Sequence, residues 1–308
     1  MRTIYLALDY KCNHNCMICP LSTFDKLHKP LSMDDVKNTI EANALGEGDR
    51  VVLSGGEPCL SALFFDTVKY IMHKGLGITM LSNVSCFADI DLVKQIEDVV
   101  DKSRFDIITA LHSSDANLHD EITGCFESHV TSLAAIGNLI QHNFHVTIKH
   151  IISKKTIKGF PLLARMISDK YPPSVDFQLT AMDFCGRAGK NLEELYISPF
   201  EMQDYIEQAL DVFEVEHIKR KITLLDFPFC WIDPYYWKYV ITKPTSAMLY
   251  SAPSLENEQR YTEEVDGQCH TVEECSDCIM QKYCFGVWES AYRLKKSEII
   301  KNITTQRR

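Results

Sequence analysis

The chain has 308 residues, a formal net charge of -10 and twelve cysteines. It is longer than a typical single domain, so we expect either one large domain with an appendage or two domains. The negative charge argues against nucleic acid or an anionic membrane as the main partner, because both favour basic surfaces. The chain shows no apolar run of membrane-spanning length and no signal segment before the first expected strand. We therefore expect a cytoplasmic protein.

Twelve cysteines are many for a chain of this kind. In a reducing compartment cysteines serve as metal ligands or buried thiols more often than as disulfides, and we expect the same here. One group lies near the start of the chain and another near its end: Cys12, Cys16 and Cys19, then Cys269, Cys275, Cys278 and Cys284. The others are scattered, where a cysteine is commonly a small buried hydrophobic residue: Cys59, Cys86, Cys125, Cys185 and Cys230.

Short apolar runs alternate with amphipathic stretches from the start of the chain to residue 179. The runs predict strands at residues 3–8, 50–54, 78–82, 105–111, 145–152 and 175–179. The stretches between them predict helices at residues 33–40, 63–73, 90–100, 130–141 and 160–171. Parallel neighbours need crossover connections, so this order predicts a parallel sheet with helices outside it. A doubly wound sheet and a partial barrel both fit, and both bind ligands at the carboxyl ends of their strands.

The first cysteine group follows the first predicted strand directly, with the spacing C-x3-C-x2-C. Three thiols this close together can converge on one side of a loop and bind three irons of a [4Fe-4S] cluster. The fourth iron is then open to another ligand. A structural zinc site is the alternative, and it would need a fourth ligand such as His14. Zinc motifs favour paired C-x2-C units, so the spacing favours the cluster.

This spacing resembles the signature of the radical S-adenosylmethionine (radical SAM) superfamily, in which the amine and carboxylate of SAM chelate the open iron. The resemblance implies that Cys12, Cys16 and Cys19 hold the catalytic cluster. It also implies an α/β fold, a partial (β/α)6 TIM-like barrel over residues 1–218. SAM would lie across the carboxyl ends of its strands.

Residues after the second and third strands are similar to SAM-binding motifs of this family. Residues 54–58 look like the GGE motif, whose backbone and carboxylate hold the SAM amino group; taken alone, the two glycines would indicate a tight turn. Residues 81–83 resemble a Thr-Asn-Gly ending, although Val84 replaces the glycine, and they either contact SAM or begin a turn. The implied contacts are Gly55, Gly56, Glu57, Pro58, Ser82 and Asn83.

Three more residues are implied as SAM contacts. Ser113 follows the fourth strand, in a segment similar to one where many members place a SAM-binding serine. Arg187 lies in a Gly-Arg-Ala-Gly turn that the subgroup often has, and a guanidinium there is suited to clamp a carboxylate. Ile18 stands where the family often places a ring against adenine, and it offers apolar contact only.

We expect His119, in the segment after the fourth predicted strand, to be a surface helix residue. Two low-weight candidates to line the barrel are Lys149 and Gln178.

The second cysteine group follows a turn-rich segment. Its C-x2-C-x5-C core, with Gly286 shortly after, resembles the auxiliary-cluster region of the SPASM/Twitch subgroup. The number of cysteines favours Twitch, with one auxiliary [4Fe-4S] cluster in a small cysteine-rich C-terminal domain over residues 219–308. The implied ligands are Cys275, Cys278, Cys284 and Cys230, with Cys269 as the rival for the fourth place. A zinc ribbon is the alternative, and either metal would supply folding energy to a short segment.

The resemblance implies an enzyme that cleaves SAM reductively and abstracts hydrogen from a substrate, with the auxiliary cluster assisting oxidation. We expect it to modify a peptide natural-product precursor by a cross-link, a thioether or an epimerisation. A dehydrogenase or cyclase acting on a sugar or nucleotide is one alternative, and a non-catalytic iron-sulfur or zinc protein is another. The expected partners are a reductant of the flavodoxin or ferredoxin type and the substrate. The first strand begins at Thr3, so a peptide substrate would need a separate recognition protein.

Overall fold

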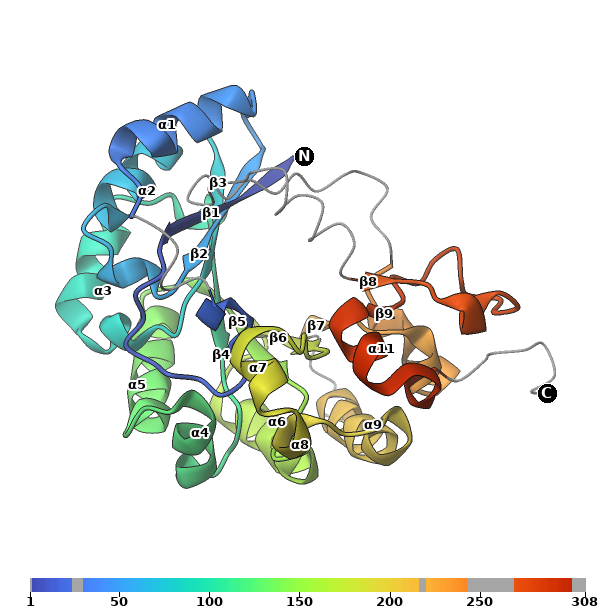
Figure 1. The fold of residues 1–308 in the computed structure, drawn as a ribbon. Helices are drawn as coiled ribbons and strands as arrows, with labels where there is room; N and C mark the ends of the chain where they lie inside the picture. Colours follow the sequence, from blue (N-terminus) through green and yellow to red (C-terminus); the bar gives the residue numbers. More distant parts are fainter. Residues whose placement is uncertain (1, 24–29, 216–219, 243–268, 301–308) are drawn as a thin grey trace.

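The fold is taken from a computed structural model that describes residues 2–23, 30–215, 220–242 and 269–300. A single sheet of seven strands, in the order β1 to β7, organises it, and every neighbouring pair is parallel. The strands curve into a partial barrel with helices on the outside (Figure 1). They are β1 Thr3–Asp9, β2 Arg50–Gly55, β3 Gly77–Leu81, β4 Phe105–Ala110, β5 His145–Ile151, β6 Asp176–Thr180 and β7 Ile222–Leu225. The predicted α/β barrel and its strand order are confirmed.

The outer layer consists of amphipathic helices that follow the strands. Ser32 begins α1 with a capping box, in which its hydroxyl accepts from the Asp35 amide and the Asp35 carboxylate accepts in return. The helices that cover the sheet are α1 Met33–Ala42, α2 Phe64–His73, α3 Ile90–Glu97, α5 Ser128–Gln141, α6 Phe160–Lys170 and α9 Pro199–Val215. Shorter helices lie near the carboxyl ends of the later strands: α4 Ala116–Thr123, α7 Gly186–Lys190 and α8 Leu192–Leu195.

Alternation along β4 shows how the sheet is packed. Phe105, Ile107 and Thr109 are buried, whereas the residues between them are partly exposed. The buried set faces the helices and belongs to one core that runs through the whole sheet. The other set faces the barrel interior, because successive side chains of a strand point to opposite sides.

Charged residues close the barrel at the amino ends of its strands. The Asp106 carboxylate pairs with Arg50 from β2 and accepts from His145 Nδ1 at 2.8 Å. His145 Nε2 lies 3.2 Å from an oxygen of Asp176, on β6. Hydrogen bonds to these two carboxylates raise the pKa of His145 to about 9. The cysteine loop lies at the opposite end of the barrel, at the carboxyl ends of the strands.

The C-terminal region contains the second cysteine group, and its described residues form short elements. It has a two-stranded antiparallel pair, β8 Cys269–His270 with β9 Val287–Trp288, and the helix α11 Glu289–Lys295. The region lies beside β7 and α9 (Figure 1). The sequence analysis assigned residues 222–225 to this region, but the structure pairs them as β7 with β6. The predicted boundary at residues 218–219 lies outside the described residues, so the division into two domains stays a prediction.

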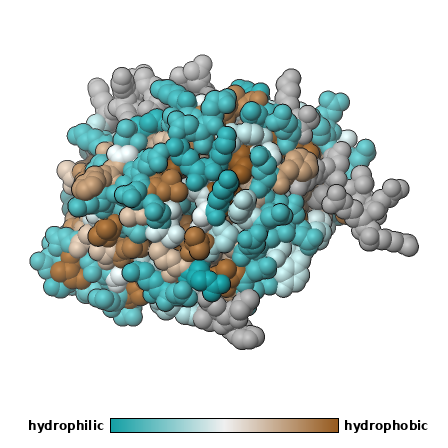
Figure 2. Space-filling model, turned by 90° about the horizontal axis from the view of Figure 1, so that it is seen from below, coloured by the Kyte–Doolittle hydropathy of each residue, from teal (hydrophilic) through white to brown (hydrophobic). Residues whose placement is uncertain are grey.

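Hydrophobic side chains are scattered over the face of the molecule seen in Figure 2, among a larger number of hydrophilic ones. Large hydrophobic residues that are exposed come from many elements, including Phe126, Leu162, Phe200 and Tyr235. In the part of the chain that the structure describes, every helix falls short of the length or the apolarity that crossing a membrane requires.

Candidate active site

The first cysteine loop begins where β1 ends. The Asp9 carboxylate accepts from the backbone amides of Tyr10 and Lys11, and this turns the chain out of the sheet. Cys12 is exposed and Cys16 and Cys19 are half-buried, and the structure joins none of the three in a disulfide. Burial raises the pKa of Cys16 to about 12, and the nearby Cys12 and Cys19 raise it further. The three thiols therefore lie within electrostatic reach of one another.

Glycines from two other segments press against this loop. A Cβ on Gly56 would lie 2.0 Å from the carbonyl oxygen of Lys11, and a Cβ on Gly186 would lie 2.4 Å from that of Pro20. Gly186 also has φ of +55°, a backbone conformation that other residues rarely adopt. The sequence analysis expected Gly55 and Gly56 to contact SAM; the structure places Gly56 against the backbone of the cysteine loop, and the contact of both with SAM stays a prediction.

Hydrogen bonds fix the loop on three sides. From β2 and its tip, the amides of Gly56 and Glu57 donate to the carbonyls of Asp9 and Lys11, each at 2.8 Å. From α4, the carbonyls of Ile122 and Thr123 each accept a loop amide at 2.9 Å. From α7, Arg187 Nε donates to the Cys16 carbonyl at 2.8 Å. Such a loop can present its thiols without a bound metal to order it, and a three-cysteine donor set suits iron.

Glu57 accepts hydrogen bonds from residues that the sequence analysis placed near SAM. Its carboxylate is buried and accepts from Ser82 Oγ and the Asn83 amide, both at 2.7 Å, and from the Cys59 amide at 3.2 Å. Burial raises the pKa of Glu57, while these three donors oppose the rise. Asn83 continues the connection, because its Nδ2 donates to Asn13 Oδ1 at 2.8 Å. The structure thus brings Glu57, Ser82 and Asn83 together beside the cysteine loop; their contact with SAM stays a prediction.

The other predicted contacts already have partners in the protein. Ser113 is buried, and its hydroxyl accepts from the Asp115 amide at 3.0 Å, one turn before α4. Arg187 holds the loop carbonyl of Cys16, where a carboxylate clamp was expected. Ile18 packs in a small apolar cluster under the loop, and Pro58 is buried at the start of the turn after Glu57. Their roles toward SAM also stay predictions.

A cluster of buried histidines lies behind the loop, and sequence reasoning missed it. His119 was expected at the surface, and this was wrong: its side chain is fully buried on the inner face of α4. Burial lowers the pKa of His119 to about 3 and that of His150 to about 4, so both rings are neutral. The spacing His119, Ile122, Thr123 on one helix face was the signal that could have shown the burial.

Polar groups line the barrel interior above the cysteine loop. Lys149 on β5 and Gln178 on β6 are register partners, so both side chains point away from the covering helices. Burial lowers the pKa of Lys149, partly offset by Asp226, which follows β7 with φ of +55°. Burial raises the pKa of Asp226 itself to about 6. Sequence reasoning missed Asp226 because it did not place β7 in the sheet.

The second cysteine group lines a small pocket. Four of its lining residues are the predicted auxiliary ligands: Cys230, Cys275, Cys278 and Cys284. The pocket is otherwise mostly apolar, with Phe229 and Met280 among its walls. Cys269 is outside this lining; its thiol lies near Asp226 and Asp183, and burial raises its pKa. Four thiols around one pocket suit a metal cluster, and Cys230 as the fourth ligand stays a prediction.

Two of the scattered cysteines lie together. The sequence analysis expected separate buried thiols, but the structure joins Cys59 and Cys86 in a disulfide, with their Cα atoms 6.6 Å apart. The two residues are 27 positions apart in the sequence. Nothing in their local sequence indicates the pairing, which depends on two strand ends that become neighbours only when β2 and β3 pair.

Comparisons with known proteins agree with this site. Residues 9–155 match the family model of the radical SAM superfamily. A Methanocaldococcus jannaschii protein, described as a candidate glycyl-radical enzyme activating enzyme, is 30% identical over 152 residues, which are 47% of this chain and 54% of that protein. The AdoMet-dependent heme synthase of Methanosarcina barkeri is 25% identical over 51% of this chain and 44% of its own length. The chain thus spans about half the length of these curated relatives.

Solved structures extend the likeness in fold to the C-terminal region. SuiB of Streptococcus suis, bound to its precursor peptide SuiA, matches with a TM-score of 0.64 and 11% identity over 98% of this chain and 74% of its own. The enzyme anSMEcpe, with bound AdoMet and the Kp18Cys peptide, matches with a TM-score of 0.65 and 12% identity over 97% of this chain and 93% of its own. The matched residues 9–155 contain the cysteine loop and the strand ends around it, so this part of the chain is similar to the radical SAM superfamily at the residues that form the candidate site.

Proposed function

We propose that this radical SAM enzyme binds a [4Fe-4S] cluster and SAM at the first cysteine loop, and one auxiliary [4Fe-4S] cluster at the second cysteine group. The observation that carries the proposal is the loop itself. Its three thiols lie within electrostatic reach of one another, on a backbone that β2, α4 and α7 hold in place. A loop held so firmly around three closely spaced thiols is suited to metal binding.

The protein's own groups have distinct roles in this proposal. When bound, the first cluster and SAM supply a 5′-deoxyadenosyl radical that removes hydrogen from an unactivated carbon. Glu57 fixes the ends of β2 and β3 relative to each other, so that Ser82 and Asn83 face the same opening as Cys12. Arg187 anchors the far side of the loop. Lys149 and Asp226 supply polar contacts for a substrate inside the barrel.

We further propose a peptide as the substrate, with a cross-link, thioether or epimer as the product. Support comes from the two solved structures above, which contain bound peptides and whose fold matches nearly the whole of this chain. The auxiliary site lies beside the barrel wall formed by β7, where a cluster could accept an electron from a substrate radical (Figure 1). The proposal includes a reductant of the flavodoxin or ferredoxin type and a separate protein that recognises the peptide.

Iron counting and product analysis test the proposal. Protein reconstituted anaerobically should hold about eight iron atoms, about four for each cluster. Replacing Cys12, Cys16 and Cys19 by alanine should remove about four, and replacing Cys275 and Cys278 should remove the other four. With dithionite and SAM, wild type and a Cys125→Ala control should release 5′-deoxyadenosine, and the first variant should release none. Equal release from that variant, or zinc in place of iron, would overturn the assignment.

A further inference from the structure

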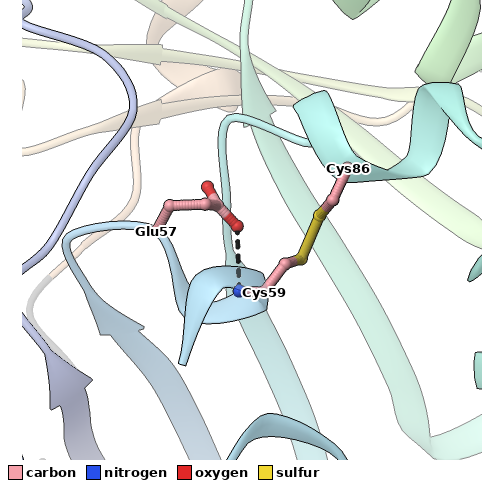
Figure 3. A group of neighbouring side chains, drawn as sticks. All are labelled: Glu57, Cys59 and Cys86. Carbon is pink, nitrogen blue, oxygen red and sulfur yellow. Dashed lines mark hydrogen bonds between the residues drawn. A yellow bond between two sulfur atoms is a disulfide. The ribbon is translucent and has the colours of Figure 1, made fainter. Parts of the chain in front are cut away.

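Cys59 and Cys86 lie in the two turns that follow β2 and β3. Cys59 belongs to the 3₁₀ turn Pro58–Leu60 and Cys86 to the 3₁₀ turn Ser85–Ala88. Figure 3 shows the bridge between them, with the Glu57 carboxylate beside it. Their Cα separation of 6.6 Å is within the range that a disulfide spans, and both residues are partly exposed. A small dissolved thiol or disulfide can therefore reach the pair.

The bridge connects the same two turns that Glu57 already connects. Glu57 accepts from the Cys59 amide in its own turn and from Ser82 and Asn83 at the end of β3. The covalent link thus runs parallel to a set of buried hydrogen bonds. Both turns follow directly on residues that we predict to bind SAM. Any change in the bridge changes how firmly these residues are held relative to each other.

The carboxylate also affects the chemistry of the two sulfur atoms. The ligand atoms of Glu57, Cys59 and Cys86 all lie within 4.8 Å of one another. Two thiolates beside a buried carboxylate would place three negative charges in one small volume, which is unfavourable. Two states avoid this repulsion without a bound cation: a pair of neutral thiols and a disulfide. A cation bound by all three groups is the rival state.

We infer that Cys59 and Cys86 form a reversible thiol-disulfide site whose oxidised form holds the two turns in the SAM-binding arrangement. The inference rests on the proposed function, since it assigns a redox dependence to that same SAM site. The oxidant is a low-molecular-weight disulfide such as glutathione disulfide. One protein thiolate attacks it and releases one glutathione, and the second then attacks the mixed disulfide and releases another. Two protein thiols lose two protons and two electrons, and one glutathione disulfide becomes two glutathione molecules.

The first experiment maps thiols in the full chain and does not involve SAM. Protein kept in anaerobic glutathione buffers of increasing oxidised fraction is alkylated, reduced, labelled a second time and analysed by mass spectrometry. We expect Cys59 and Cys86 to become protected from the first alkylation at the same oxidised fraction. Dithiothreitol should make both thiols available for labelling again. Cys125, a partly exposed cysteine outside any disulfide, is the internal control and should stay alkylated. Thiols that stay free at every ratio, or one zinc ion bound per chain through this pair, would overturn the inference.

The second experiment measures SAM binding by equilibrium dialysis on cluster-loaded protein without dithionite. Because the bridge reduces the freedom of the two turns before binding, we expect the dissociation constant to rise at least about threefold when the bridge is opened. The double variant Cys59→Ser with Cys86→Ser should bind SAM like the wild type with an open bridge, and its dissociation constant should not depend on glutathione. The Cys125→Ser variant should show the same rise in dissociation constant as wild type when the bridge is opened. Equal affinity of the two forms, or tighter binding by the open form, would overturn the coupling. Binding of SAM by neither form would instead overturn the proposed function and the coupling with it, while thiol mapping would still decide whether the bridge is reversible.

Discussion

The two cysteine regions are built in different ways. The first is a loop on the rim of a seven-stranded sheet, held by hydrogen bonds from β2, α4 and α7 and pressed by glycines from two segments. In the second, the described residues form two strands of two residues, one short α-helix and short 3₁₀ turns, around a pocket that four cysteines line. The barrel thus holds the first loop through hydrogen bonds from three of its elements, whereas the described residues of the second region are grouped around their own cysteines.

This difference indicates what each metal contributes. At the first loop the folded barrel already positions the thiols, so a cluster adds reactivity more than it adds stability. At the second region the mostly apolar walls include four thiols, and the bonds from those thiols to a metal would provide much of the folding free energy of the segment. The first group of cysteines is therefore expected to add mainly reactivity, whereas the second is expected to stabilise its segment in addition to its proposed role in electron transfer.

Metal removal should separate the two regions most strongly. Chelation of the reconstituted protein should leave β1 to β6 protected from hydrogen exchange, because these strands pair with one another in the sheet and pack mainly on its covering helices. The segment from β8 to α11 should lose most of its protection, since its ordering free energy is lost with the metal. Hydrogen-exchange mass spectrometry of the cluster-loaded and the chelated protein measures the protection of both segments. Equal loss of protection in the barrel, or full retention of it in residues 269–295, would show that the two regions do not differ in this way.

Gly56→Ala tests whether the fold orders the first loop. The new Cβ would lie 2.0 Å from the Lys11 carbonyl oxygen, so the loop backbone must move. We expect the variant to lose about 3 kcal/mol of unfolding free energy and most of the iron of the first site. Gly137→Ala is the matched control, because a Cβ there meets nothing within 4 Å and the residue lies in α5. The control should be neutral or slightly stabilising. Denaturant titration measures the unfolding free energy, and iron analysis measures how much of the first site is filled. Unchanged iron content in Gly56→Ala would contradict the prediction that the fold orders the first loop.

The sequence predicted the features that depend on local patterns. Six strands in the right order and both cysteine groups follow from apolar runs and spacing. It did not predict contacts between distant segments. Arg187 donates to a carbonyl 171 residues earlier in the chain, and the Cys59–Cys86 pair needs β2 and β3 to be neighbours. The strand β7 was placed outside the barrel because a short apolar run before Pro228 gives no sign of which sheet it joins.

The smallest expected effect concerns the end of the barrel opposite both metal sites, where His145 bridges Asp106 and Asp176. Its pKa is raised from 6.5 to about 9 by hydrogen bonds to those carboxylates, so the folded state holds a proton that the unfolded chain releases. The stabilisation is complete below about pH 6.5 and is lost as the pH rises through about 9. The side chain is 41% exposed, so solvent screening limits the effect to about 1 kcal/mol.

Denaturant unfolding between pH 6 and pH 10 measures this loss, and the difference between wild type and His145→Gln isolates it from other titrating groups. The unfolding free energy of wild type should exceed that of the variant at pH 6, and this difference should disappear by pH 10. The iron content of both proteins should stay unchanged. A constant difference would mean that His145 is not charged in the folded protein. A fall in iron with pH in wild type alone would mean that the two ends of the barrel are coupled, so that the first cysteine loop depends on more than the segments in contact with it.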